Sequence, residues 1–193
     1  MDRNKSKMNY PSFENCTIAI VGLGYVGLPL AIEFSKTNYC LKSKLKLSRK
    51  VIGFDINKKR IEELKQNYDK TREVNKDELK NLKNIFFTND FKSLVNADVF
   101  IVTVPTPIDE SKIPFLGHLI SASKTVGEVL RIRKEKNNSA PFPFVIYEST
   151  VYPGATEEIC IPEIEKESGL KASKDFKYGY SPERINPGDN ELK

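Results

Sequence analysis

Short apolar runs alternate with longer amphipathic segments along the chain. The runs are rich in β-branched and aromatic residues, which is typical of strands buried on both faces of a sheet. They lie at residues 16–22, 50–55, 84–90, 97–105, 142–150 and within 176–183. Apolar residues at helical spacing predict helices between them, over residues 24–36, 57–68, 91–95, 119–133 and 156–168. This order predicts an α/β fold, a Rossmann-like, doubly wound and mainly parallel six-stranded sheet with helices on both faces.

Two segments interrupt the alternation, at residues 40–50 and 133–143. We interpret both as surface insertions. In the first, Lys42, Lys44 and Lys46 alternate with leucine, a pattern that favours a solvated loop and is also compatible with a strand pair or a weak membrane-surface patch.

The composition supports one globular domain in water. The chain has 193 residues, of which 39% are hydrophobic and 30% charged, and no apolar run approaches the length of a membrane span. Residues 1–15 form a polar extension without the apolar middle of a secretory signal, so we expect a cytoplasmic protein. The net charge of +5 suits an anionic ligand, but the clustered basic face of a nucleic-acid binder is not evident.

The cysteines and the single histidine do not indicate a metal site. Cys16, Cys40 and Cys160 are odd in number and widely spaced, which argues against a disulfide framework and against zinc. Only Cys40 has the basic neighbours that activate a thiol, and it lies beside the insertion, so we expect unreactive thiols. We expect His118, near the start of a helix, to be a surface residue rather than a proton shuttle.

The first predicted strand ends in a G-x-G-x-x-G turn made by Gly22, Gly24 and Gly27. Gly22 allows a tight turn, Gly24 lets a pyrophosphate approach the backbone, and Gly27 lets the helix pack close to the strand. The N–H groups of Tyr25 and Val26, with the dipole of the helix, would supply positive potential. Three glycines can equally form an empty structural turn.

An acid follows the second strand, where a dinucleotide fold needs an acceptor for the adenosine ribose. Asp55 takes this position, 28 residues after Gly27, and the insertion at 40–50 explains the long spacing. An aspartate there would repel a 2′-phosphate, which favours NAD over NADP. Arg60 could stack beside the adenine or neutralise phosphate. The alternative for Asp55 is a helix-capping role before Asn57.

Hydroxyl and charged groups follow three later strands. Val104 and Thr106 lie in a turn where the dinucleotide should pass, although ordinary turn chemistry also explains it. Ser149 and Thr150 form a hydroxyl pair suited to positioning a ribose, a nicotinamide or a catalytic water. After the last strand, Glu183 is a candidate base and Arg184 a candidate clamp for an anionic substrate, with an exposed ion pair as the alternative.

Five motifs in this order resemble the amino-terminal half of UDP-glucose/GDP-mannose dehydrogenases. They are GLGYVGLPLA, VIGFDIN, VPTPID, YESTVYPGATEE and GYSPERINPGD. The resemblance is greatest to the branch that oxidises UDP-N-acetylhexosamines for surface polysaccharides. It extends from about Cys16 to Asp189, which divides the chain into a polar extension (1–15), an NAD-binding Rossmann domain (16–189) and the start of a connection to a further domain (190–193).

The resemblance implies oxidation of the sugar C6 alcohol to a carboxylate with two NAD, through a thiohemiacetal and a thioester on a cysteine. It implies that Asp55 and Arg60 hold the adenosine end, that Thr106 and Ser149 line the cofactor, and that Thr150 and Glu183 serve the water and proton steps. The stretch at residues 69–74 resembles a cofactor-side loop of the same family, with an exposed charged turn as the alternative.

The family pattern also implies parts that this chain lacks. The nucleophilic cysteine and the segment that forms homodimers would follow Asp189, so we expect this chain alone to be inactive as an enzyme. Phe115 stands where the family generally has an acid, and Pro187 stands where the glucose-oxidising branch has a second glutamate, which favours the N-acetylhexosamine branch. The alternatives are a non-catalytic dinucleotide-binding or interaction module and a 6-phosphogluconate-like or hydroxyacid dehydrogenase.

Overall fold

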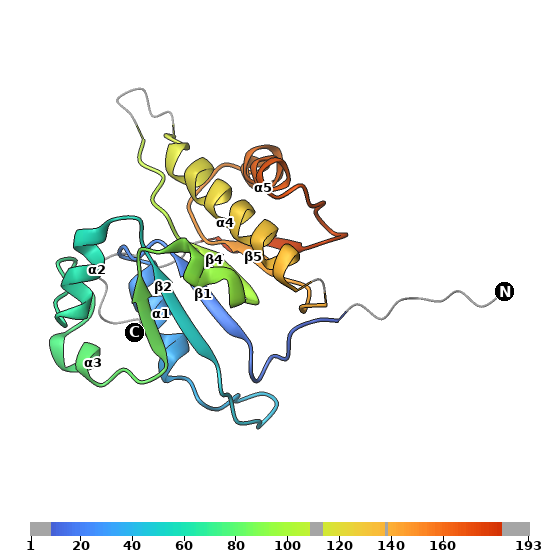
Figure 1. Ribbon diagram of the computed structural model, residues 1–193. Helices are drawn as coiled ribbons and strands as arrows, with labels where there is room; N and C mark the ends of the chain where they lie inside the picture. Colours follow the sequence, from blue (N-terminus) through green and yellow to red (C-terminus); the bar gives the residue numbers. More distant parts are fainter. Residues whose placement is uncertain (1–8, 109–113, 138, 183–193) are drawn as a thin grey trace.

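The computed structural model describes residues 9–108, 114–137 and 139–182 (Figure 1). Its strands are β1 (Thr17–Val21), β2 (Lys50–Phe54), β3 (Ile85–Thr88), β4 (Val99–Val102), β5 (Phe144–Tyr147) and β6 (Lys177–Tyr180). Its helices are α1 (Gly27–Lys36), α2 (Lys58–Lys65), α3 (Lys76–Lys80), the 3₁₀ helix η1 (Phe91–Asn96), α4 (Gly117–Lys136), the π turn η2 (Thr156–Cys160) and α5 (Ile161–Ser168).

The six strands form one parallel sheet in the order β3-β2-β1-β4-β5-β6. The chain therefore starts in the middle, builds outward to β3, crosses back over β1 and continues to β6, which is the doubly wound order expected. This order brings the carboxyl ends of β1 and β4 side by side where the winding reverses. The predicted fold class is confirmed.

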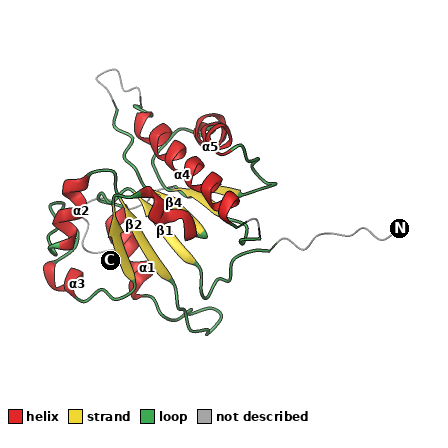
Figure 2. Ribbon diagram, in the orientation of Figure 1, coloured by secondary structure: helices red, strands yellow, loops and turns green. Residues whose placement is uncertain are grey.

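Alternate residues of β1 face two separate hydrophobic cores, one on each side of the sheet. Ala19 and Val21 belong to the core beneath α4 and α5, whereas Ile18 and Ile20 belong to the core beneath α1 and α2. Figure 2 shows helices on both faces of the sheet. Because a strand alternates its side chains between faces, only a continuous apolar run can fill both cores.

The helices differ from the predictions in two respects. The five-residue helix α3 was not predicted, because it is too short to show periodicity, although Asn75 caps it by accepting from the N–H of Glu78. The segment 156–168, predicted as one helix, begins with the π turn η2. Pro162 has no N–H to donate, which fits a change of helical geometry just before it.

The segment 133–143 was predicted as a surface insertion, but its first residue lies in the interior. Helix α4 continues to Lys136, and Arg133 is buried, with its Nη2 2.9 Å from Asp98 Oδ1. Asp98 Oδ2 in turn accepts from the N–H of Thr17 at the start of β1.

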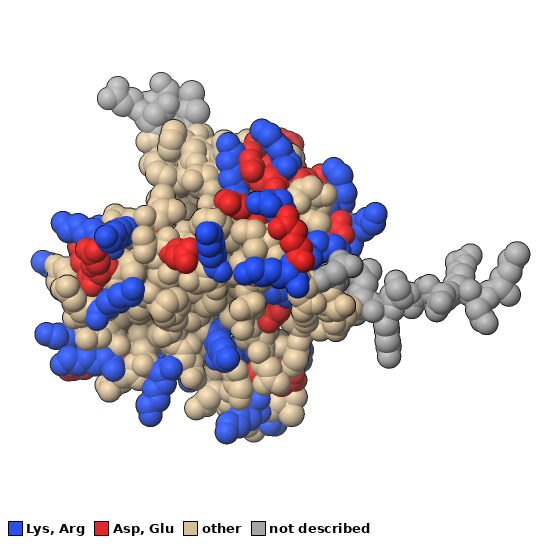
Figure 3. All heavy atoms as spheres, viewed as in Figure 1, with Lys and Arg blue, Asp and Glu red and all other residues tan. Residues whose placement is uncertain are grey.

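The segment 40–50 is a surface insertion only in part: residues 41–46 are exposed, but Leu47 and Arg49 are buried. Tyr39 and Lys46 form an antiparallel bridge, so the segment is a short hairpin, closer to the strand pair than to the solvated loop that was favoured. Lys and Arg side chains stand along the lower and left margins of the molecule (Figure 3).

Candidate functional site

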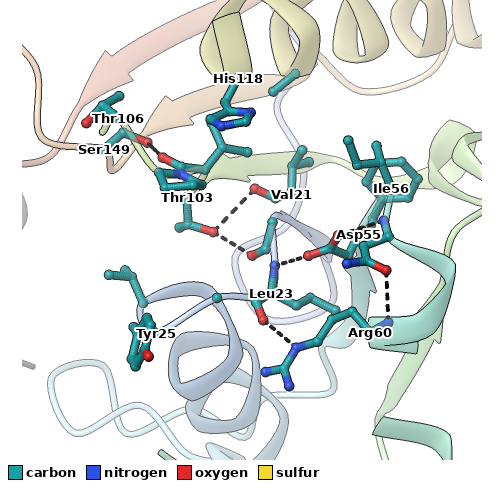
Figure 4. Close-up of a pocket in the computed structure, with 18 of the residues that line it drawn as sticks. Val21, Leu23, Tyr25, Asp55, Ile56, Arg60, Thr103, Thr106, His118 and Ser149 are labelled. Carbon is teal, nitrogen blue, oxygen red and sulfur yellow. Dashed lines mark hydrogen bonds between the residues drawn. The ribbon is translucent and has the colours of Figure 1, made fainter. Parts of the chain in front are cut away.

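A cleft of about 560 Å³ lies at the carboxyl ends of β1, β2, β4 and β5. Such an edge, where the strand order reverses, is where doubly wound sheets bind ligands. The cleft is lined by the glycine turn, the residues after β2, Lys70 and Thr71, the residues after β4 and β5, and one side of α4 near its start (Figure 4). Of the sequence-predicted residues, the structure brings together here Gly22, Gly24, Tyr25, Val26, Asp55, Arg60, Val104, Thr106, Ser149 and Thr150.

The glycine turn has the tight turn predicted at Gly22 and the close packing predicted at Gly27. Gly22 has φ +100°, a left-handed conformation that favours glycine. A Cβ on Gly27 would lie 1.9 Å from the carbonyl oxygen of Gly22 and 2.4 Å from Thr103 Oγ1, so helix α1 can approach β1 and β4 only without a side chain here. A Cβ on Gly24 would meet nothing within 4 Å, so this glycine borders open space. Gly27 packs inside and Gly24 faces the cleft.

Helix α1 begins directly behind this turn. Its N-cap, Val26, provides no side-chain hydrogen bond, and no acidic residue lies in its first turn. The partial positive charge of the helix N-terminus is therefore not neutralised by the helix itself. Tyr25, at the mouth of the turn, is 56% exposed. The N-terminus of α1 is thus available for an anion.

Asp55 ties the end of β2 to the glycine turn. Its Oδ2 accepts from the N–H of Leu23 at 3.0 Å and its Oδ1 from the N–H of Asn57 at 2.9 Å. The cap of α2 is Asn57, whose side chain accepts from the N–H of Arg60, so the capping role considered for Asp55 falls to its neighbour. Each carboxylate oxygen can accept a further hydrogen bond, and Asp55 lines the cleft, which suits ribose hydroxyls.

Arg60 lies beneath the glycine turn. Only 3% of its side chain is exposed. Its Nε donates to the carbonyl oxygen of Leu23 at 2.9 Å (Figure 4). Its Nη2 lies 2.7 Å from Asp69 Oδ1. These contacts engage the guanidinium with the protein itself. The stacking on adenine and the phosphate contact predicted for Arg60 stay predictions, whereas its hold on the turn is observed.

Asp69 organises the loop between α2 and α3. Its carboxylate accepts from the hydroxyl and N–H of Thr71 and from the N–H groups of Glu73 and Val74, at 2.7–3.1 Å. Burial alone would raise the pKa of Asp69, but these hydrogen bonds and the contact with Arg60 outweigh it and lower that pKa. The loop predicted as a charged turn is thus built around a buried carboxylate, and its Lys70 and Thr71 line the cleft.

Hydroxyl groups join the ends of the central strands. Thr103 Oγ1 donates to the carbonyl oxygen of Gly22 at 2.8 Å, and Ser149 Oγ donates to that of Val104 at 2.7 Å. Thr106 Oγ1 donates to the carbonyl oxygen of Thr150 at 2.5 Å. The turns after β1, β4 and β5 are therefore held in one arrangement. Thr103 was not among the predicted site residues; its signal is a hydroxyl directly after a buried strand that pairs with the glycine strand.

Two predicted residues, Glu183 and Arg184, lie outside the described part of the chain. The structure follows β6 to its end, where the N–H of Ser181 donates to the carbonyl oxygen of Tyr147. His118 is exposed, as predicted, yet it lines the cleft, and its ring meets that of Phe115 edge to face at 5.3 Å. Phe115 is the residue at which the acid of the resembled family was expected.

The cysteines lie away from the cleft. Cys16 and Cys160 are buried, and burial raises the pKa of both thiols. Hydrogen bonding from Ser43 lowers the pKa of the partly exposed Cys40, in the loop between α1 and β2. No cysteine borders the cleft, so none is placed to attack a ligand bound there.

Two further searches cover the described residues only. In residues 9–108, 114–137 and 139–182, no three His, Cys, Asp or Glu side chains form a group that could hold a metal ion. No helix in these same ranges has the length and apolar character to cross a membrane.

Known proteins resemble this chain over almost its whole length. The model of the NAD-binding domain of the UDP-glucose/GDP-mannose dehydrogenase family matches residues 16–191. The UDP-N-acetyl-D-glucosamine 6-dehydrogenase of Pseudomonas aeruginosa is 54% identical over 174 residues, which are 90% of this chain and 36% of that protein. Protein CapL of Staphylococcus aureus is 53% identical over 175 residues, 91% of this chain and 36% of that protein.

A solved structure has the same arrangement of strands and helices. The crystal structure of a ternary complex of GDP-mannose dehydrogenase from Pseudomonas aeruginosa superposes with a TM-score of 0.73 at 28% identity, over 88% of this chain and 36% of that one. The chain spans about 36% of the length of the curated relatives that it matches.

Proposed function

The chain belongs to the UDP-glucose/GDP-mannose dehydrogenase family, and from this we propose that it is the cofactor-binding part of an NAD-dependent UDP-N-acetylhexosamine 6-dehydrogenase. Residues 16–189 would form the NAD-binding domain and residues 190–193 would begin the connection to a further domain. The observation that carries the proposal is the convergence of the glycine turn, Asp55 and the hydroxyl-bearing strand ends on one cleft. The family also weighs against a 6-phosphogluconate-like or hydroxyacid dehydrogenase.

The residues around the cleft fit a dinucleotide. The open side of Gly24 and the N-terminus of α1 suit the pyrophosphate, with Tyr25 and Val26 beside it. Asp55 suits the hydroxyls of the adenosine ribose, and its negative charge disfavours a 2′-phosphate, which supports NAD over NADP. Ile56, 71% exposed directly after Asp55, offers an apolar side chain for the adenine. The cleft volume of about 560 Å³ lies within the usual range of cofactor pockets.

The oxidised nicotinamide, when bound, accepts a hydride from C6 of the sugar. The chain would contribute positioning and proton handling around it. Val104, Thr106 and Ser149 would hold the nicotinamide half, because their hydrogen bonds fix the turns after β4 and β5 in one geometry. Thr150, exposed beside them, would orient a water or the sugar hydroxyl, and Glu183 would accept its proton.

The remaining steps of the oxidation would use groups that this chain does not place at the cleft. Formation of a thioester needs a thiolate within reach of C6, and the three cysteines here are buried or remote. We assign the nucleophile, and the contacts of a homodimer, to a domain outside these residues. Arg184 would pair with the anionic diphosphate of the substrate. The isolated chain should therefore bind the cofactor without oxidising a sugar.

For the substrate we propose UDP-N-acetyl-D-glucosamine, as a step in surface polysaccharide synthesis. The support is the 54% identity to a protein that bears this activity in its name. Pro187, in place of a second glutamate, favours an N-acetylhexosamine over glucose on the family pattern.

Titration of the chain with NADH, followed by energy transfer from tyrosine to the nicotinamide, tests the cofactor site. We expect NADH to bind more tightly than NADPH, and Asp55→Asn to weaken NADH roughly tenfold or more, since it removes a charged acceptor. Asp77→Asn, on the exposed surface of α3, is the matched control. If AMP binds well while NAD and NADH do not, the dinucleotide site is refuted.

Assays of the full-length protein on UDP-N-acetylglucosamine, UDP-N-acetylgalactosamine, UDP-N-acetylmannosamine and UDP-glucose test the reaction. We expect UDP-N-acetylglucosamine to be preferred, with two NADH formed for each uronic acid. Preference for another sugar would overturn the substrate proposal alone. NADH binding without turnover of any of the four would favour the non-catalytic module instead.

A further inference from the structure

The connection between α1 and β2 is a small hairpin at the amino edge of the sheet, opposite the cleft. We name residues 39–46 the basic hairpin. Tyr39 and Lys46 form an antiparallel bridge, and the N–H of Cys40 donates to the carbonyl oxygen of Leu45 at 2.8 Å. Lys44 has φ +58° and donates its N–H to the carbonyl oxygen of Cys40, which closes the tip. The segment therefore has a defined shape.

The residues that follow attach the hairpin firmly to the body of the protein. Leu47 is buried. Arg49 is also buried; its Nε donates to the carbonyl oxygen of Phe13 at 3.0 Å, and its guanidinium lies 4.1 Å from the centre of the Phe13 ring. The N–H of Ser48 donates to the carbonyl oxygen of Glu14. The hairpin thus projects from an anchored base, visible at the bottom of Figure 1.

Apolar and cationic side chains alternate on the projecting part. Leu41 is 81% exposed and Leu45 46% exposed. Lys42, Lys44 and Lys46 are exposed between and beside them. From residue 36 to residue 54 the sequence contains six Lys and Arg and no Asp or Glu. Exposure of a leucine side chain to water does not stabilise the fold. Transfer of this side chain from water into an apolar phase is favourable.

The part of the sequence that contains the hairpin carries an excess of positive charge. Residues 36–84 contain fifteen Lys and Arg against seven Asp and Glu, a net charge of +8, whereas the remaining residues sum to −3. Lys and Arg side chains stand along the lower and left margins of the molecule, where these residues lie (Figure 3). An anionic surface approaching the hairpin would therefore meet a complementary field.

We infer that the basic hairpin docks the protein on an anionic membrane surface, with Leu41 and Leu45 entering the headgroup region and the three lysines pairing with lipid phosphates. A projecting tip that carries exposed leucines between lysines suits the headgroup region of an anionic bilayer, where apolar and negatively charged groups lie side by side. Because the hairpin and the cleft lie at opposite edges of the sheet, docking leaves the cleft open to solution. The inference is independent of the cofactor and of the reaction proposed above.

Flotation of the 193-residue chain with vesicles tests the inference. The vesicles are phosphatidylcholine alone, or phosphatidylcholine with about one-third phosphatidylglycerol, at roughly 0.1 M salt. We expect binding to the anionic vesicles only. Each lysine near the membrane surface contributes about fivefold to the partition coefficient. The triple variant Lys42→Gln/Lys44→Gln/Lys46→Gln should therefore lower it roughly 100-fold. Leu41→Ser/Leu45→Ser should lower it about tenfold or more without a change of charge.

The control is Lys136→Gln/Lys166→Gln/Lys174→Gln, which removes three exposed lysines on the α4 and α5 side and changes the net charge equally. This control variant should retain most of the vesicle binding. Measuring the unfolding temperature and the NADH affinity of every variant checks that each one is folded. Three results would overturn the inference: no binding by the folded parent chain, equal losses in the hairpin and control triples, or full binding by the leucine variant. Association of the chain with itself or with an acidic polypeptide, without vesicle binding, would assign the hairpin to a protein contact instead.

Discussion

Replacing Asp69 by alanine should destabilise the chain by about 3–5 kcal/mol, the usual cost of removing one partner from a buried ion pair. The side chain of Asp69 is fully buried and that of its partner Arg60 is 3% exposed. The change leaves the guanidinium with only the more distant carboxylate of Glu63, whose Oε2 lies 4.0 Å from Arg60 Nη1. It also removes the acceptor of three backbone N–H groups and of the Thr71 hydroxyl, some of which water can reach once the loop relaxes. The free energy of unfolding of a typical domain is only about 5–15 kcal/mol, so the variant should be close to unfolding.

Urea denaturation followed by circular dichroism measures this loss. Asp77→Ala on α3 is the control, since Asp77 is 88% exposed and its oxygen lies 3.8 Å from Lys80 Nζ; it should cost less than about 1 kcal/mol. The cycle with Arg60→Met and the double variant isolates the pair, and we expect the double variant to be more stable than Asp69→Ala alone. A loss below about 1 kcal/mol for Asp69→Ala would refute the structural role assigned to the pair.

Asp69→Asn, which keeps the size of the side chain but removes its charge, should also affect the cofactor site. Arg60 holds the carbonyl oxygen of Leu23, so freeing its guanidinium from Asp69 loosens the glycine turn from below. In folded Asp69→Asn we expect the affinity for NADH to fall roughly tenfold. This is about the contribution of one charge-assisted hydrogen bond. Unchanged NADH affinity in the folded variant would show that the turn does not depend on this support.

Three further predictions concern stability and reactivity. Gly27→Ala should cost roughly 3 kcal/mol or more in urea unfolding, because the added methyl group has no room between helix and strand; a loss under about 1 kcal/mol would contradict this packing. Because the pKa of Asp69 is lowered by folding, its contribution to stability should be complete above the unfolded value near pH 4 and should disappear as the pH falls through the folded value. The stability difference between the parent chain and Asp69→Asn should therefore shrink in acid, and a difference independent of pH would exclude the carboxylate as its source. With a thiol reagent at neutral pH, Cys40 should react first, whereas Cys16 and Cys160 should react only on unfolding; early reaction of either would place it in solvent.

Local patterns were sufficient for the elements of the fold and for part of the site. Continuous apolar runs predicted six parallel strands, and Asn57 was correctly predicted to begin a helix. The spacing of Gly22 and Gly27 predicted a tight turn against a closely packed helix, which the backbone has. These features depend on residues a few positions apart, so the local sequence is enough to predict them.

Side-chain partners remote in sequence could not be predicted in this way. For Arg60 the sequence suggested only stacking beside the adenine or a phosphate contact, which stay predictions, and did not indicate its contacts with Leu23 and Asp69. Thr103 was passed over, although it donates to the carbonyl oxygen of a residue 81 positions earlier. Arg133 was assigned to a surface insertion and lies buried against Asp98. The local sequence around each of these polar groups is compatible with a side chain that faces water and with one that contacts a buried partner.

The sequence by itself determined the alternation of strands and helices, the glycines of the turn, the acid after the second strand and hence the family of the chain. Only the tertiary structure decided which strand ends lie side by side, and so which hydroxyls and charges meet around the cleft. The physical reason is that backbone periodicity follows from neighbouring residues, whereas the partner of a buried polar group is chosen by the packing of the whole sheet.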